Sequence, residues 1–261
     1  MKVFITGASS GIGEALAHEY AQRHQHENAI IGLVARRSEH LQKLQKILET
    51  NYDIKCAIYP LDVRDSAALA TAAADFMQQH GTPDVVIANA GVSSGTLTAH
   101  KEDIAAFQAV MDINVLGLVH TFQPFIDAMR RAGAGKLVGI ASVAGIRGLP
   151  GAGAYSASKA AAIAYLESLR VEMLPHNIAV TTIAPGYIRT PMTDINSYPM
   201  PFLMHADVAA TKFVDAIECK RRFCVIPWQM GWVARLMRLI PPVLWDFMAK
   251  NAPHKSRIHV E

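Results

Sequence analysis

Near its start the chain reads Val3-Phe4-Ile5-Thr6-Gly7-Ala8-Ser9-Ser10-Gly11-Ile12-Gly13. A short apolar run leads into a glycine-rich turn, and a helical pattern follows at once. Gly7 permits a tight turn, Gly11 lets backbone approach a pyrophosphate, and Gly13 lets the helix pack closely on a sheet. The helix N-terminus offers N–H groups and the positive end of a dipole to phosphates. The stretch therefore predicts a dinucleotide-binding turn between a strand and a helix.

The same turn allows a second interpretation. Gly7-Ala8-Ser9-Ser10-Gly11 matches the G-x-S-x-G pattern of the nucleophile elbow in α/β hydrolases, in which Ser9 would attack an acyl group. Such an elbow takes an oxyanion-hole N–H from a loop on an earlier strand, and no earlier strand is predicted here. It also needs an acid and a histidine later in the chain. Asp194 and His205 are the candidates, but neither lies in a local signature, so we favour the dinucleotide turn.

Short apolar runs alternate with longer helical patterns along the chain. Most runs are apolar throughout, which is typical of parallel strands that are covered on both faces. The rhythm predicts an α/β fold of the Rossmann type: a doubly wound parallel sheet of about seven strands with helices on both faces. The expected strands are 3–6, 29–35, 54–61, 85–88, 136–141, 179–184 and 224–227. The expected helices are 13–25, 39–50, 66–80, 104–129 and 155–174.

Length and composition narrow the class of protein. The chain has 261 residues without an evident linker or repeat, so we expect one dinucleotide-binding oxidoreductase domain over residues 1–261. Apolar residues make up 51% and charged residues 18%, which excludes a disordered chain. A net charge of +3 without a basic stripe argues against nucleic-acid binding. Three cysteines without metal spacing suit a reducing compartment, and we expect a cytoplasmic protein with no signal peptide or spanning helix.

The histidines form no predicted metal site. The segment His18-Glu19-Tyr20-Ala21-Gln22 fails the H-E-x-x-H pattern because Gln22 stands where the second histidine is needed. We therefore expect chemistry that depends on an organic cofactor rather than on a metal ion.

The end of the second expected strand indicates which dinucleotide binds. In NAD-binding sheets an acidic residue about 20 positions past the glycine turn accepts bonds from the ribose 2′-hydroxyl. Ala35 holds that place here, and Arg36 and Arg37 follow it. Because arginine binds phosphate bidentately, the sequence favours NADP(H) over NAD(H). Asp62, after the third strand, is placed either to bind the adenine amino group or to cap the next helix.

Four further residues form a candidate catalytic group. Tyr155 and Lys159 lie one helical turn apart on one face. A phenol with a pKa of about 10 is almost un-ionised at neutral pH, and a nearby ammonium group lowers that pKa. The pair thus makes an acid or base poised near the working pH. Ser142, at the end of the fifth strand, can bond to the reacting oxygen, and Asn114 is placed to bind a water that links Lys159 to solvent.

In their order and spacing these motifs resemble the short-chain dehydrogenase/reductase family over about residues 2 to 227. The motifs that carry the resemblance are residues 6–13, Asn89-Ala90-Gly91, Asn114, Ser142, Tyr155-x3-Lys159, and Pro185-Gly186 with Thr190. The resemblance implies a catalytic tetrad of Asn114, Ser142, Tyr155 and Lys159, in which the lysine also holds the nicotinamide ribose. It assigns Ile188 and Thr190 to the nicotinamide carboxamide. Many members carry two asparagines in the fourth-strand motif, whereas this chain has Ala88 before Asn89.

The expected cofactor-binding residues extend along the whole strand edge. They are Gly7, Ser9, Ser10, Gly11, Ile12, Gly13, Arg36, Arg37, Asp62, Val63, Asn89, Ala90, Gly91, Tyr155, Lys159, Pro185, Gly186, Ile188 and Thr190. No basic residue accompanies Ser9 and Ser10 in the glycine turn, so the NADP(H) preference rests on Arg36, Arg37 and Ser9.

The last third of the chain carries two apolar features. The resemblance makes residues about 187–206 the loop that covers the substrate, and its three methionines adapt to bulky apolar shapes. Residues about 228–249 carry Trp and Leu at helical spacing, and Pro241-Pro242 predicts two short helices rather than one span. A core or subunit interface is the favoured interpretation of this stripe. A helix lying on a membrane surface is the alternative, because tryptophan and arginine suit a headgroup boundary.

Together these features predict an NADP(H)-dependent oxidoreductase that interconverts a carbonyl and an alcohol, specifically a reductase of an apolar ketone or aldehyde. A non-catalytic dinucleotide-binding sensor or scaffold is the alternative. The expected partners are a small-molecule substrate and other copies of the chain. In the family the helix at 155–174 commonly builds a dimer face, which implies a homodimer or homotetramer.

Overall fold

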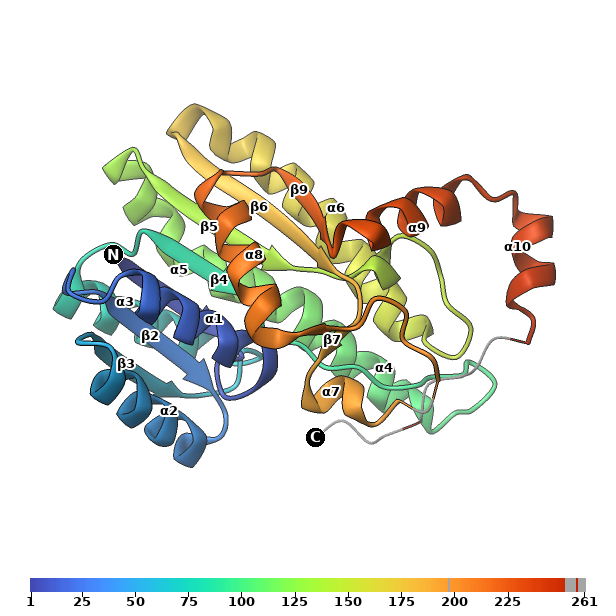
Figure 1. The fold of residues 1–261 in the computed structure, drawn as a ribbon, viewed down its shortest axis with the longest axis horizontal. Coiled ribbons are helices and arrows are strands. Elements are labelled where there is room, and N and C mark those ends of the chain that lie inside the picture. Colours follow the sequence, from blue (N-terminus) through green and yellow to red (C-terminus); the bar gives the residue numbers. More distant parts are fainter. Residues whose placement is uncertain (197, 252–256, 258–261) are drawn as a thin grey trace.

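One parallel sheet between two layers of helices organises the molecule (Figure 1). The computed structural model describes residues 1–196, 198–251 and 257. Its seven main strands are β1 (Lys2–Thr6), β2 (Ile30–Ala35), β3 (Lys55–Pro60), β4 (Val85–Ala88), β5 (Gly135–Ile140), β6 (Ile178–Pro185) and β9 (Phe223–Ile226). They pair in parallel in the order β3-β2-β1-β4-β5-β6-β9. The predicted fold class is confirmed, and every strand end lies within a residue of its expected place.

The two faces of the sheet bury separate apolar cores. The helices on one face are α1 (Gly11–Arg23), α2 (Ser38–Asn51) and α8 (Ala206–Glu218), and those on the other are α3 (Ser66–His80), α5 (Gly117–Ala132) and α6 (Gly153–Met173). Alternate residues of one strand serve the two cores: Ile5 packs toward the first and Phe4 toward the second. This explains why the strands are apolar throughout.

The long helix expected at 104–129 has a change of pitch in its middle. It consists of α4 (Asp103–Met111), a π-helical turn at Asp112–Leu116, and α5. The stretch Asp103–Ala132 is long and apolar enough to cross a membrane by length and composition. In the fold, however, Phe122 and Phe125 are fully buried in the second core. One face of this stretch therefore packs inside the folded molecule, with 39% of its most apolar part buried, and the π turn carries Asn114.

The remaining elements lie beyond the carboxyl edge of the sheet. The two-residue strands β7 (Ile188–Arg189) and β8 (Met204–His205) pair with each other and enclose α7 (Pro191–Asp194). The last two helices are α9 (Trp228–Leu239) and α10 (Pro242–Ala249), which project to one side of the molecule (Figure 1). Two short helices separated at the prolines were expected, and this prediction is confirmed.

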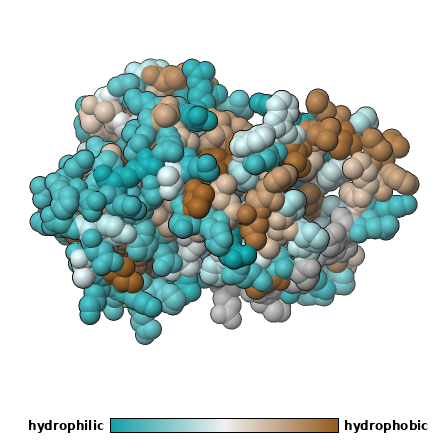
Figure 2. Space-filling model, in the orientation of Figure 1, coloured by the Kyte–Doolittle hydropathy of each residue, from teal (hydrophilic) through white to brown (hydrophobic). Residues whose placement is uncertain are grey.

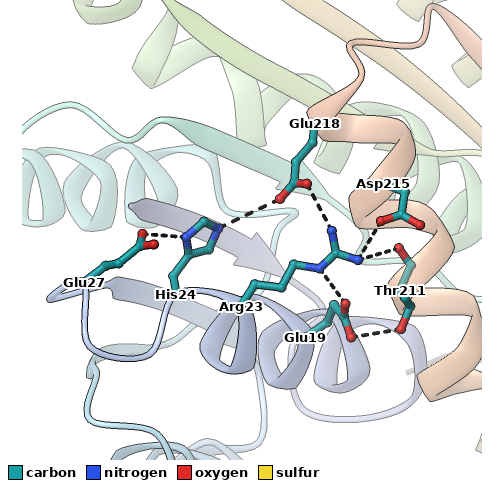
Figure 3. Close-up of polar contacts among 7 residues, drawn as sticks. All are labelled: Glu19, Arg23, His24, Glu27, Thr211, Asp215 and Glu218. Atoms are coloured by element: carbon teal, nitrogen blue, oxygen red, sulfur yellow. Dashed lines mark hydrogen bonds and ion pairs between the residues drawn. The ribbon is translucent and has the colours of Figure 1, made fainter.

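A polar network joins α1 to α8 (Figure 3). The Arg23 guanidinium donates to Glu19 at 2.6 Å, to Asp215 at 2.7 Å and to Glu218 at 3.0 Å. It also donates to the carbonyl oxygen of Thr211 at 3.1 Å. Hydrogen bonds to charged groups are the stronger ones in proteins. The Arg23 side chain thus joins three carboxylates on two helices, and its partner Glu218 lies 195 positions away in the sequence.

Replacing Arg23 by methionine is expected to lower the free energy of unfolding by about 1–3 kcal/mol, because the three carboxylates lose their shared donor. Arg130→Met is the matched control, since Arg130 forms a single 3.8 Å pair with Asp127 on an exposed surface. The control should stay within about 0.5 kcal/mol of the wild type. Urea unfolding measures both variants, and equal midpoints for the two would contradict the structural role of Arg23.

Candidate active site

A cleft of about 420 Å³ opens at the carboxyl ends of the strands. Its wall collects residues that the sequence places far apart, as the switch point of a doubly wound sheet requires. The predicted residues that line it are Gly7, Ser9, Ser10, Gly11, Ile12, Arg36, Arg37, Asp62, Val63, Asn89, Ala90, Gly91, Ser142, Tyr155, Lys159, Pro185, Gly186, Ile188 and Thr190. Gly13 and Asn114 do not line the cleft, but each contacts a residue that does: Gly13 packs on Gly7, and Asn114 bonds to Val92.

The glycine turn is fastened to the end of β4. The Asn89 side chain donates to the carbonyl oxygens of Thr6 at 3.0 Å and Gly7 at 3.2 Å. Gly7 has a φ of +68°, and a Cβ there would lie 2.8 Å from the Cα of Ala90. At Gly13 a Cβ would lie 2.2 Å from the carbonyl oxygen of Gly7. These glycines are therefore required by close packing, and the turn forms a cradle of backbone at the start of α1.

The N-terminus of α1 lies beside a guanidinium group. Ser10 occupies the N-cap position, but its side chain makes no capping bond. Instead Arg37 donates to Ser9 Oγ at 3.0 Å and to Ser10 Oγ at 3.1 Å. A helix N-terminus, two hydroxyls and a guanidinium make a group of donors that suits phosphate. The residues present thus fit the phosphates of a dinucleotide.

Asp62 forms ion pairs with two arginines. Arg64 donates to it at 2.7 Å, and Arg36 lies 3.8 Å away. Desolvation raises the pKa of the Asp62 carboxyl, but the bonds from Arg64 outweigh it, so the pKa is lowered overall. The capping alternative for Asp62 is wrong, because Asp65 is the N-cap of α3 and accepts from Ala68 N at 2.9 Å.

Tyr155, Ser142 and Lys159 meet at the inner end of the cleft. Lys159 is 5% exposed, and its Nζ donates to the carbonyl oxygen of Ile140 at 2.9 Å and lies 5.9 Å from the centroid of the Tyr155 ring. Burial lowers the pKa of Lys159 to about 8. Burial raises the pKa of Tyr155, and a hydrogen bond with Ser142 opposes that rise. The expected lowering of the Tyr155 pKa is absent from these contacts, because desolvation of the phenol is the larger effect.

Asn114 supports the site from the π-helical turn. Its Oδ1 accepts from Val92 N at 2.8 Å, and its Nδ2 donates to Val92 O and Ser158 Oγ, both at 2.9 Å. A Cβ on Gly91 would lie 3.2 Å from Asn114 Oδ1 and 3.5 Å from Lys159 Nζ. Both N–H donors of the Asn114 side chain are in use, and the residue ties the segment after β4 to α6.

Five cleft residues were not predicted from the sequence: Leu61, Val92, Ile113, Ile140 and Ala141. Four more were expected near the site without a binding role, namely Ala35 before the two arginines, and Pro191, Met192 and Thr193 in the loop expected to cover the substrate. Most contribute backbone or apolar surface and carry no motif. Thr193 is the exception: it forms a capping box with Thr190, and its hydroxyl donates to Ile188 O at 2.7 Å. Its spacing gave no signal in the sequence, because a capping box usually has Glu or Gln where Thr193 stands.

The geometry disfavours the hydrolase interpretation. Ser9 Oγ accepts from Arg37, and in the described part of the chain no histidine forms a hydrogen bond with Ser9. Both Asp194 and His205 are exposed at the ends of α7 and β8. Ser9 therefore has a cation beside it where an acyl-transfer nucleophile needs a base.

Comparison with known proteins agrees with this site. The family described as short chain dehydrogenase matches residues 1–198. An uncharacterized oxidoreductase of Myxococcus xanthus is 34% identical over 247 residues, covering 95% of each chain. An 11-beta-hydroxysteroid dehydrogenase 1A of Arabidopsis thaliana is 34% identical over 265 residues, which cover 94% of this chain and 73% of the plant protein.

Among solved structures, a short-chain dehydrogenase from Sphingobium yanoikuyae in complex with NADPH superposes with a TM-score of 0.77. It shares 25% identity, and the alignment covers 92% of this chain and 96% of that one. The sheet order, the cleft and these matches agree with one another. The chain therefore belongs to the short-chain dehydrogenase/reductase family of oxidoreductases.

Proposed function

We propose that the protein is an NADP(H)-dependent reductase that converts an apolar ketone or aldehyde to an alcohol. The observation that carries the proposal is the meeting of Tyr155, Ser142 and Lys159 at the end of a cleft whose other end holds Arg37. The bound cofactor supplies the hydride that reduces the carbonyl carbon. The chain supplies the proton and orients the carbonyl oxygen, so one functional unit spans the whole sheet edge.

In this proposal Tyr155 is the proton donor. Its raised pKa keeps the phenol protonated at neutral pH, which is the form that a reduction needs. Without substrate, the Ser142 hydroxyl bonds to Tyr155 and opposes the rise in its pKa. With substrate bound, the same hydroxyl donates to the carbonyl oxygen instead. Lys159 places a positive charge beside the ring, which favours the phenolate left after proton donation. Asn114 holds Val92 and Ser158 in place around this pair. Because both N–H donors of its side chain are already bonded, the water that links Lys159 to solvent would bind to another group of Asn114.

Tyr155→Phe tests the proton donor. The variant keeps the ring and loses the hydroxyl, so kcat for carbonyl reduction should fall by about 10²–10⁴. NADPH affinity, measured by fluorescence titration, should stay within about twofold. Turnover that survives the change would contradict the mechanism. A wild-type protein that binds NADPH and reduces no carbonyl would instead favour the sensor or scaffold alternative.

The preference for NADP(H) rests on the donors near the glycine turn. Ala35 leaves no carboxylate to repel a 2′-phosphate, and Arg36 and Arg37 line that end of the cleft. Arg37 is already joined to Ser9 and Ser10, so three donors converge there.

Arg37→Met should weaken NADPH binding at least about tenfold, or about 1.4 kcal/mol, through loss of the contact with the ribose 2′-phosphate. NADH affinity should change by less than about twofold, since NADH lacks that phosphate. Arg130→Met, which removes an arginine that does not line the cleft, serves as the control. Parallel titrations decide the matter: an equal loss for both dinucleotides would contradict the assignment.

The loop after β7 adds apolar surface to the cleft. Pro191 and Met192 line the cleft, and Met204 packs on the first core. These residues, together with the likeness to a hydroxysteroid dehydrogenase, support a bulky apolar carbonyl compound.

We also propose that the protein works in the cytoplasm as a homodimer or homotetramer. The apolar stripe of α9 was expected to serve a core or a subunit interface, but Trp228, Trp232 and Leu236 are 69%, 63% and 64% exposed, so the core of this chain does not cover it. We propose that α9 and α10 make the peripheral membrane contact that was the alternative. Apolar side chains gather over these helices (Figure 2). Leu239 is 79% and Val243 83% exposed. Within residues 228–251 the charged side chains are Arg235, Arg238, Asp246 and Lys250, a net positive set. Apolar area flanked by cations suits an anionic bilayer surface.

Sedimentation with vesicles of anionic phospholipid tests this contact. The wild type should pellet with anionic vesicles and less with zwitterionic ones, and the double change Leu239→Ser and Val243→Ser should abolish pelleting. A protein that ignores vesicles, but forms an oligomer that the same double change dissociates, would contradict the membrane proposal and assign this surface to subunit contact.

A further inference from the structure

The loop from β5 to α6 joins two of the proposed catalytic residues. Ser142 is the second residue after β5, and Tyr155 lies in the first turn of α6, which begins at Gly153. Its first part is the 3-10 turn Val143–Gly145, which packs on α6. A Cβ on Gly145 would lie 2.6 Å from the carbonyl carbon of Lys159, so the turn rests directly on the backbone of the catalytic lysine. The course of this loop and the placement of the catalytic group are therefore linked.

Arg147 extends from this loop to the C-terminal arm, by which we mean α9 and α10 together. Its Nη1 donates to the carbonyl oxygens of Met237 at 2.7 Å and Ile240 at 2.6 Å. In a continuing helix the Met237 carbonyl would accept from residue 241. That residue is Pro241, which has no N–H. Arg147 supplies the missing donor, at a helix C-terminus that favours a positive charge.

The same guanidinium also contacts the second helix of the arm. Its central carbon lies 4.8 Å from the ring centroid of Trp245 in α10, within cation–π range. One side chain thus touches the arm on both sides of its proline break. The start of α9 is fixed separately, because a Cβ on Gly186 would lie 2.6 Å from the Cγ of Met230. Gly186 lines the cleft, so the arm adjoins the site there, and Arg147 joins it to the loop after β5.

We infer that Arg147 is a positioning residue that couples the C-terminal arm to the catalytic loop. Through it, the position of the arm sets the geometry of Ser142 against the substrate oxygen. Arg147 does not line the cleft, so its effect falls on carbonyl reduction and spares NADPH binding. The inference rests on the proposed function for its kinetic consequence, whereas the mechanical coupling itself can be measured without turnover.

Kinetics of three variants test the consequence. Arg147→Met removes both donors and the charge, and it should lower kcat at least tenfold while NADPH affinity stays within twofold. Arg147→Lys keeps an ammonium that can donate to the two carbonyls, and it should recover most of the lost kcat. Arg130→Met is the control and should match the wild type. The coupling is overturned if Arg147→Met matches that control, or if lysine restores nothing in a variant that remains folded.

Amide hydrogen exchange of the intact protein tests the coupling directly. Trp245→Leu leaves Arg147 and both of its carbonyl bonds in place but removes the ring from the arm. We expect faster exchange in residues 143–152 for this variant and a larger increase for Arg147→Met, with no change for Arg130→Met. If exchange in residues 143–152 is unchanged in both Trp245→Leu and Arg147→Met, the inference is overturned. Absence of turnover in the wild type would contradict the proposed function only, and exchange would still decide the coupling.

Discussion

The candidate active site depends on one buried ammonium group. Lys159 is almost fully removed from water, and its Nζ bonds to the carbonyl of Ile140, the last residue of β5. A charge in such a place is costly, and its cost appears as a pKa lowered to about 8. The surrounding chain packs closely around it: Gly145 lets the next turn rest on the Lys159 backbone, and a Cβ on Gly91 would lie 3.2 Å from Asn114 Oδ1. β4, β5 and α6 therefore have to converge here, and their convergence forms the inner end of the cleft.

The opposite end of the cleft is chemically different. Arg37 bonds to the serine hydroxyls of the glycine turn there, Arg36 lies 3.8 Å from Asp62, and Pro191 and Met192 add apolar surface to the cleft. A ligand that fits both ends has a phosphate-rich half and an apolar reaction partner. The C-terminal arm extends this apolar side outward, and Arg147 links the arm back to the catalytic loop.

The strands and the site residues could be predicted from the sequence because both follow from one rule. Buried parallel strands are apolar throughout, and their carboxyl ends meet at one edge, so residues such as Asn89 and Ser142 had to lie together. Contacts that depend on side-chain conformation could not be predicted. Asp65 rather than Asp62 caps α3, and the Asn114 amide is occupied by Val92 and Ser158. Tyr155 was expected to have a lowered pKa, but desolvation outweighs its hydrogen bond. Arg147 carried no signal, because its partners lie 90 and 93 positions away.

The pH dependence of carbonyl reduction tests the central claim, that a buried lysine beside the proton donor sustains the chemistry. Lys159 is protonated below its pKa of about 8 and neutral above it. At saturating NADPH, kcat/KM for the carbonyl substrate should therefore be level at lower pH. It should fall about tenfold per pH unit as the pH rises above about 8. A rate that stays level to about pH 10, near the ordinary pKa of a lysine, would contradict the account.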